Sequence, residues 1–322
     1  MDRDQELEEM KRIDLRLIAA DWGFDVNRKR SSRNSIAMDG PAGERILIGL
    51  GQDGHYVYYN VHDTTDAGSA IDFVQRRQGG TLGTVRKLLR PYLVGGERLT
   101  ASAPLPPLQP VARDVLALRR HYEAFKPVNG YHAYLCEERM IPAELLAQPK
   151  FAERLRIDDR GNAVFPHYTD QGLVGWEARG PGFVSFSKGG QKALWCSVPG
   201  SDDQTLVLAE GSIDALSYAV LAGHSRSRFI SFSGALNKEQ PALIAQAIAK
   251  MPMGSMIVAA IDNDDAGDQY VAVLEELFRS AARVDLTFRV DRPERRGQDW
   301  NDALTTPLPR PAGKTRSVPR PE

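Results

Sequence analysis

The fold is decided by residues 206–214, LVLAEGSID, where an apolar run ends at Glu210 and a turn of small residues follows. A short apolar run bounded by such a turn is typical of a strand that is buried on both faces of a parallel sheet. Apolar residues then recur at helical spacing from Ile213 until Gly223. The stretch therefore predicts a strand over 205–209 followed directly by a helix.

The same alternation continues downstream. Apolar patterns predict strands over 229–232 and 256–261, and an edge strand over 284–290. Helical spacing predicts helices over 239–250 and through Val271 and Phe278. Strands that alternate with helices imply right-handed crossovers and a mainly parallel sheet flanked by helices. Upstream, residues 162–180 predict two strands joined by a turn at residues 170–172.

Acidic residues follow the predicted strands. Glu210 ends the first, Asp262 and Asp264 follow the strand over 256–261, and a third acidic motif, QDWND, occupies residues 298–302. The carboxyl ends of parallel strands meet at one edge of a sheet, so these motifs converge there. Asp262 and Asp264 are two residues apart, so in extended backbone their side chains share a face and suit one Mg²⁺ or Mn²⁺ ion.

Glu210 has a different predicted role. Neighbouring carboxylates resist its ionisation and raise its pKa, which suits general acid/base chemistry. Nearby acidic side chains that could support the site are Asp214, Asp265, Asp299 and Asp302. The alternative is that these residues cap helices or lie on solvated turns, and Asp264 or Asp265 is well placed to cap the helix that begins near Ala266.

Together the two main acidic motifs resemble the Toprim domain, which is shared by bacterial primases, topoisomerases and certain nucleases. The resemblance implies an α/β Toprim domain over residues 201–304, a mainly parallel sheet flanked by helices, preceded by smaller α+β domains. It also implies that Glu210, Asp262 and Asp264 are the catalytic residues and the ligands of Mg²⁺ or Mn²⁺.

Residues 112–200 carry a second resemblance. Phe165-Pro166, Asp170, Gly172 and Arg179 look like the segment that precedes Toprim in bacterial replicative primases, where it forms part of a basic cleft that grips template and nucleotide. This primase-core-like α+β segment implies phosphate contacts by Arg179, Lys188 and Lys192, with arginine favouring bidentate geometry. The alternative is a hairpin whose cations form a solvated face.

Residues 1–98 are similar, over 68–74 and 81–89, to the end of the zinc-ribbon domain with which primases read template. That domain holds zinc through three Cys and one His. The chain has only Cys136 and Cys196, both outside the segment, so we expect a degenerate zinc-ribbon-like domain with no zinc and with His55 and His62 as surface residues. Its core is expected from Ile46, Leu47, Ile48, Leu50, Tyr56, Val57 and Tyr58.

Composition sets further bounds. The chain has 322 residues and a formal net charge of −1, so attraction of nucleic acid depends on local basic clusters. Residues 99–111 predict a Pro-rich linker and residues 305–322 a disordered basic tail. Two cysteines, no signal peptide and no long apolar span predict a cytoplasmic protein without a membrane role.

The sequence thus predicts a metal-dependent enzyme that acts on phosphodiester bonds. The leading interpretation is a primase-like nucleotidyltransferase in DNA replication of a plasmid, phage or integrated element. It would act on single-stranded DNA or RNA with nucleotides and with a helicase or relaxase supplied in trans. The alternatives are a Toprim nuclease and a non-catalytic nucleic-acid-binding accessory factor of a mobile element.

Overall fold

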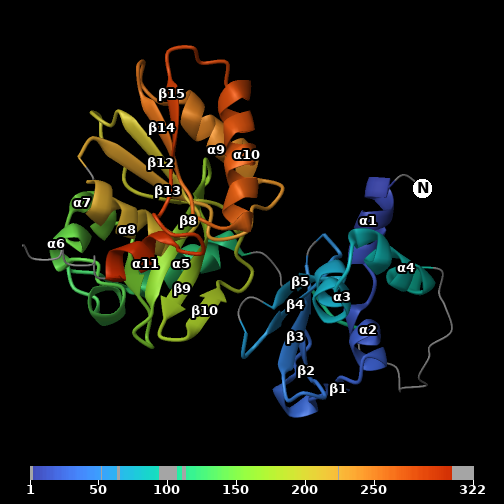
Figure 1. Cartoon of the computed structure of the whole chain (residues 1–322). Coiled ribbons are helices and arrows are strands. Elements are labelled where there is room, and N and C mark those ends of the chain that lie inside the picture. The colour runs from blue at the N-terminus through green and yellow to red at the C-terminus, as the bar shows by residue number, and fades with distance from the viewer. Residues whose placement is uncertain are drawn as a thin grey trace, which may run out of the picture. The chain divides into compact units, whose positions relative to one another are not determined.

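The computed structural model describes residues 3–51, 53–63, 66–93, 107–110, 114–223 and 225–306. The chain divides into two compact units, residues 1–113 and 114–322 (Figure 1). The predicted linker over 99–111 lies outside the described residues except for 107–110. The predicted tail over 305–322 lies outside them beyond residue 306.

The first unit is an antiparallel sheet of five strands in sequence order, covered by helices. Its strands are β1 (Asp25–Val26), β2 (Ser35–Asp39), β3 (Arg45–Leu50), β4 (Tyr56–Asn60) and β5 (Ala67–Ser69), its α-helices are α1 (Arg3–Lys11), α2 (Leu15–Asp21), α3 (Ala70–Gln78) and α4 (Leu82–Leu93), and η1 (Arg28–Arg30) is a short 3₁₀ turn. The helix α3 begins at a capping box formed by Ser69 and Asp72.

Alternation along the strands decides which side chains form the core of this unit. Ile46, Ile48 and Tyr58 are buried as expected, because residues two apart share a face. Val57 lies on the opposite face and is 46 % exposed, so the expectation that it joins the core is wrong. The core is completed by helix residues such as Phe73 of α3.

Asp66 is a buried carboxylate in this unit, and its oxygens are fully engaged. It accepts hydrogen bonds from the Tyr58 hydroxyl at 2.6 Å, from Asn60 Nδ2 at 3.1 Å and from Arg77 Nη2 at 2.9 Å. Burial acts to raise the pKa of Asp66, but these three donors outweigh it and lower the pKa. The Arg77 guanidinium also stacks 3.9 Å from the centroid of the Phe73 ring.

The second unit contains two sheets. The antiparallel sheet has the order β10-β9-β8-β7-β6 and contains the predicted hairpin, which forms as β8 (Ala163–Thr169) and β9 (Gly172–Gly180). Its other elements are β6 (Lys126–Pro127), β7 (Arg156–Ile157) and β10 (Phe183–Phe186), with α5 (Val115–Ala124), the π-helical η2 (Tyr134–Glu138), α6 (Ala143–Leu146) and α7 (Pro149–Ala152) around it.

The other sheet has the order β11-β13-β12-β14-β15 and is parallel except for β11. Its strands are β11 (Trp195–Cys196), β12 (Thr205–Ala209), β13 (Ser227–Ser231), β14 (Met256–Ala260) and β15 (Thr287–Asp291), and its helices are α8 (Ser212–Ala222), α9 (Gln240–Ala249), α10 (Asp265–Ser280) and α11 (Trp300–Thr305). The predicted mainly parallel sheet flanked by helices is confirmed. The edge strand begins at Thr287, later than predicted, because an ion pair between Arg283 and Asp285 occupies the preceding turn.

Both faces of the parallel sheet are covered, which explains its continuous apolar strands. Leu206 and Leu208 of β12 pack with residues of α9 and α10, whereas Val207 and Ala209 pack with α8 and α11 (Figure 1). The core on the α8 face also contains Phe165 of β8, a strand of the antiparallel sheet, and Trp195 of β11. The two sheets of this unit therefore share one hydrophobic core.

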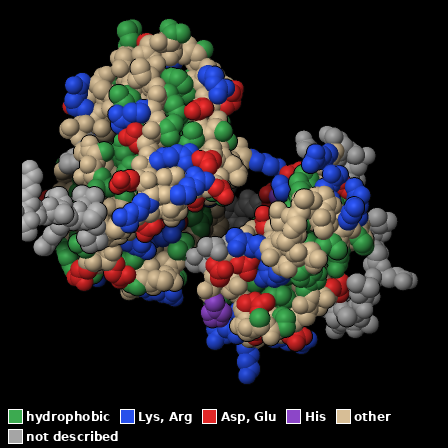
Figure 2. Space-filling view, viewed as in Figure 1, with side chains coloured by type: hydrophobic (Ala, Val, Ile, Leu, Met, Phe, Trp, Pro, Cys, Tyr) green, Lys and Arg blue, Asp and Glu red, His purple; other side chains and the backbone are tan. Residues whose placement is uncertain are grey.

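Among the described residues, no helix combines the length and the apolar character that crossing a membrane requires. Acidic and basic side chains are interleaved on the face shown in Figure 2, as the net charge of −1 leads one to expect.

Candidate active site

Glu210 and Asp262 lie at the same edge of the parallel sheet, which we call the acidic rim. Ala209 and Ala260 are paired in register on the neighbouring parallel strands β12 and β14, and the two acidic residues follow these strands directly. Asp214, in the first turn of α8, and Asp299, the N-cap of α11, add two further carboxylates to the rim. The predicted convergence of the acidic motifs agrees with this placement.

The rim carboxylates resist ionisation. Burial, followed by the charge of Asp264, raises the pKa of Glu210 to about 7 against the opposing effect of Lys192. The pKa of Asp262 is also raised, most strongly by burial and then by the charges of the surrounding acidic residues, Asp214, Glu210, Asp299 and Asp264. The pKa of Asp214 is raised by burial and then by the charges of Asp299 and Glu210. The pKa of each group therefore depends on the ionisation of its neighbours.

Two rim oxygens are buried without a hydrogen-bond partner: Oε2 of Glu210 and Oδ1 of Asp262. Hard oxygen donors of this kind fit Mg²⁺, which needs only one or two carboxylates beside water and substrate oxygens. In the described part of the chain, no group of three or more His, Cys, Asp and Glu side chains is arranged to hold a metal ion by itself. The rim therefore fits a cation that Asp262 holds together with one further carboxylate and with water or substrate oxygens.

Asp264 combines a place near the rim with a structural role. Its backbone is extended, and its Oδ1 accepts a hydrogen bond at 2.7 Å from the backbone N–H of Gly267, which caps α10. Gly267 is required here because a Cβ at this position would lie 2.1 Å from the Asp262 carbonyl oxygen. The close approach of α10 to the strand end therefore fixes where Asp262 and Asp264 lie.

Asp265 is held away from the rim, whereas the charge of the exposed Asp302 adds to the burial that raises the pKa of Asp299. The Asp265 side chain is 97 % exposed and pairs with Arg296, which also reaches Asp268 at 2.8 Å. Asp302 is exposed in α11, where its backbone N–H donates to Asp299. Of the four supporting residues named from sequence, the structure brings Asp214 and Asp299 to the rim and leaves the other two at the surface.

Two of the three predicted phosphate-binding cations lie beside the rim. Arg179 of β9 forms an ion pair with Glu177 at 2.8 Å and acts to lower the pKa of Asp214. Lys192 donates to the Ala235 carbonyl at 2.5 Å; burial lowers its pKa to about 8, against the opposing charges of Glu177 and Glu210. Lys188 is exposed in the loop after β10 and is not among the main charges that act on the rim.

Arg139 is a rim cation that sequence reasoning did not single out. It follows η2, donates to the Tyr134 hydroxyl at 2.9 Å and to Asn301 Oδ1 at 3.2 Å, and acts to lower the pKa of Asp299. The Asn301 side chain in turn donates to the Arg139 carbonyl at 2.8 Å. The contact spans more than 160 residues, so no local pattern announces it.

Comparisons with known proteins agree with this geometry. Residues 207–304 match a family model described as Toprim-like, and residues 133–203 match a model described as a protein of unknown function (DUF3991). Comparison with curated proteins gives no match.

Three solved structures are similar to the chain at low identity. A DNA primase domain from Pseudomonas aeruginosa is 15 % identical with a TM-score of 0.33, and the match covers 49 % of this chain and 52 % of that one, about half its length. The primase fragment of the bacteriophage T7 primase-helicase protein is 16 % identical with a TM-score of 0.37, covering 63 % and 76 %. The RNA polymerase domain of Mycobacterium tuberculosis primase DnaG is 16 % identical with a TM-score of 0.31, covering 59 % and 72 %.

The family match begins within β12 and ends within α11, so it contains every carboxylate of the acidic rim. Residues 207–304 of this chain are therefore a Toprim-like domain.

Proposed function

We propose that the chain is a divalent-metal-dependent enzyme that acts on phosphodiester bonds, and most specifically a primase-like nucleotidyltransferase. One observation carries the proposal: on a Toprim-like domain, Glu210 and Asp262 end adjacent parallel strands and each buries a carboxylate oxygen that has no partner. Such oxygens are costly unless a cation or substrate engages them.

Asp262 and Asp264 are the proposed metal ligands, with Glu210 as a further ligand or as the general base. A bound Mg²⁺ or Mn²⁺ would neutralise negative charge on a reacting phosphoryl group. Glu210, with its pKa raised to about 7, is suited to accept the proton of an attacking ribose hydroxyl near neutral pH. Asp214 and Asp299 lie at the same site, and their charges add to the burial that raises the pKa of Asp262.

Arg179 and Lys192 are proposed to bind phosphate oxygens of template or nucleotide. Both lie close enough to the rim to act on its carboxylates, and Lys192 is still mainly protonated at pH 7 because its pKa is about 8. Lys188, exposed on the neighbouring loop, is proposed to contact the strand farther from the metal. Positive charge beside an acidic rim gives a place for both the ion and the polyanion.

The enzyme is further proposed to belong to a plasmid, phage or integrated element, with a helicase or relaxase supplied in trans. The absence of cysteine from residues 1–98 supports a first unit without structural zinc. Elemental analysis of the purified chain should find no stoichiometric zinc. One zinc per chain would contradict this part of the proposal.

The main test incubates the full chain with single-stranded DNA, labelled nucleotides and Mg²⁺ or Mn²⁺, and scores both extension and cleavage. We expect extension that Asp262→Asn abolishes together with Mn²⁺ binding. Glu276→Gln, which changes an exposed carboxylate on α10, is the matched control and should leave both intact. Cleavage without extension would identify a nuclease, and metal-independent strand binding with neither reaction would identify an accessory factor.

A further inference from the structure

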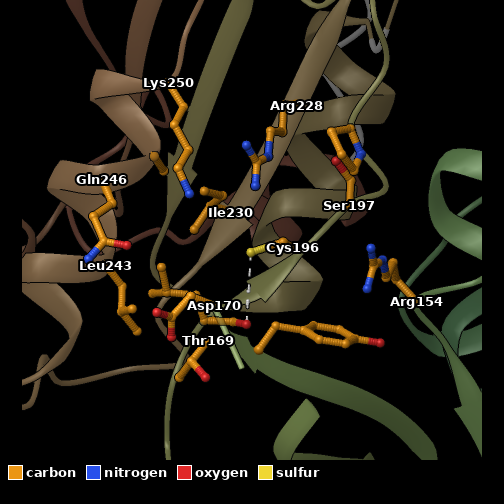
Figure 3. Close-up of a pocket in the computed structure, with 14 residues that line it drawn as sticks. Arg154, Thr169, Asp170, Cys196, Ser197, Arg228, Ile230, Leu243, Gln246 and Lys250 are labelled. Atoms are coloured by element: carbon orange, nitrogen blue, oxygen red, sulfur yellow. Dashed lines mark hydrogen bonds between the residues drawn. The ribbon is translucent and has the colours of Figure 1, made fainter. Parts of the chain in front are cut away.

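A separate cavity of about 250 Å³ opens at the β11–β13 edge of the parallel sheet (Figure 3). It is bounded by α9, by β11 and β13, and by the turn of the β8–β9 hairpin. Arg228 in its wall pairs in register with Leu206, four residues before Glu210, so the cavity is not part of the acidic rim. None of the rim residues lines it.

Three cations from three different elements surround this cavity. Figure 3 shows Arg154, which follows α7, Arg228 of β13 and Lys250, the C-cap of α9, arranged around Cys196. Asp170, on the hairpin turn, is the one acidic residue among those that line the cavity. The lining side chains therefore carry an excess of two positive charges in a concave site.

The two arginines each carry one buried donor without a partner, although the Arg228 side chain also hydrogen-bonds to Cys196. The Nε atoms of Arg154 and Arg228 are both buried without a hydrogen-bond partner. Burial raises the pKa of the Cys196 thiol while Arg228 and Arg154 oppose the rise, which places both guanidinium groups near the same sulfur atom. Two guanidinium groups near one sulfur atom, each with a buried Nε–H that has no partner, are suited to a multiply charged acceptor.

The dimensions limit what that acceptor is. The cavity volume of about 250 Å³ is many times the roughly 10–15 Å³ that one water molecule needs. A phosphate group fills only part of it, and the apolar side chains of Leu243 and Ile230 line the remainder. Tyr168 adds an aromatic ring, over which the Arg154 guanidinium stacks at 4.3 Å from the centroid.

We propose that this cavity binds a small phosphorylated molecule of mononucleotide size, with its phosphate between Arg154 and Arg228 and its organic part against Leu243 and Ile230. Lys250 adds long-range attraction at the open side. The site is distinct from the metal-dependent chemistry at the rim and does not depend on it.

The test titrates the full chain, in the presence of EDTA, with inorganic phosphate and with a nucleoside 5′-monophosphate, by calorimetry. We expect one site per chain, with tighter binding of the nucleotide. Arg154→Gln and Arg228→Gln should each weaken binding about tenfold or more, because each removes a charge-assisted contact. Arg160→Gln, which changes an exposed arginine in the turn before β8, is the matched control and should bind as the wild type does.

Asp262→Asn should also bind the nucleotide normally, which separates this proposal from the one for the acidic rim. Protection of Cys196 in the wild-type chain tests the same site without any substitution, so the proposal stays testable if an arginine variant fails to fold. Bound nucleotide should slow the reaction of Cys196 with a thiol reagent and leave Cys136, outside the cavity, unaffected.

Three results would overturn the proposal. The first is no saturable binding of either probe, and the second is unchanged affinity in both arginine variants. The third is binding of an oligonucleotide without terminal phosphate that the mononucleotide does not displace, since the surface would then hold a strand rather than a small molecule.

Discussion

Asp66 in the first unit and Asp262 in the second are both largely removed from solvent, yet their surroundings shift the pKa of the two carboxyl groups in opposite directions. Asp66 accepts hydrogen bonds from Tyr58, Asn60 and Arg77, and its pKa is lowered. Asp262 faces Asp214, Glu210 and Asp299, keeps one oxygen without a partner, and has a raised pKa.

The difference separates a carboxylate that completes a fold from one that is kept available. Donors aimed at a buried carboxylate stabilise the folded chain, whereas carboxylates gathered at one point destabilise it until a cation binds. Residue type alone does not distinguish the two cases. The neighbouring charges do, and each of the following predictions tests that distinction.

The largest expected effect concerns the division of roles within the rim. Glu210→Gln should lower turnover by about 10² to 10⁴, because it removes a proton acceptor, while Mn²⁺ binding changes little. Extension assays and calorimetry on the same preparation measure the two quantities. If Glu210→Gln loses Mn²⁺ as severely as Asp262→Asn does, Glu210 is a metal ligand instead.

Removing the satisfied carboxylate should cost stability. Asp66→Ala leaves Arg77 and Tyr58 without their acceptor, and we expect a loss of about 3 kcal/mol in the unfolding free energy of the first unit. Chemical denaturation followed by fluorescence would measure it. Mn²⁺ binding at the rim should be unaffected, and a loss there would show that the variant acts on more than the first unit.

Removing an unsatisfied carboxylate should do the reverse. Burial, followed by the charges of Asp214 and Glu210, raises the pKa of Asp262 from 3.8 to about 9, so the stability that its protonated form contributes is complete below about pH 4 and is lost as pH rises towards 9. In EDTA at pH 8, Asp262→Asn should therefore unfold with a free energy higher by about 1–2 kcal/mol, after allowance for solvent screening, and the gain should vanish near pH 4.

Thermal unfolding across this pH range, with Glu276→Gln as the control, would measure that gain. Added Mg²⁺ should also reduce it, because the cation relieves the same repulsion in the wild type. If Asp262→Asn is less stable than the wild type at pH 8, the Asp262 carboxylate stabilises the fold, as that of Asp66 does, and the prediction is wrong.

The smallest effect concerns the cations beside the rim. Arg179→Ala should lower the slope of log affinity for single-stranded DNA against log salt by about 0.7, the contribution of one phosphate. Titrations at several salt concentrations test this, with Arg160→Ala as the control. An unchanged slope would show that Arg179 serves only its ion pair with Glu177.

The parallel sheet and the acidic rim were predictable because their signals are local. Strand β12 is a run of apolar residues, and Glu210 lies where that run ends. The sequence only suggested that the charge of Asp299 raises the pKa of Asp262, because that effect requires α11 to return to the carboxyl ends of the strands. Strand β11 has two residues and no pattern of its own, and the contact of Arg139 with Asn301 joins distant segments, so neither could be derived from spacing.

Two features of the second unit limit where its gene can be cut. Strand β11 pairs with β13. Phe165 and Trp195 also share one hydrophobic core with Val207 and Phe229 of the parallel sheet. A fragment that starts at residue 204 would leave β13 with an open edge and would uncover aromatic side chains, both of which favour aggregation. Residues 114–306 should therefore behave as one inseparable block in gene fusions, and an exchange of parts between relatives should succeed only at a junction that precedes α5.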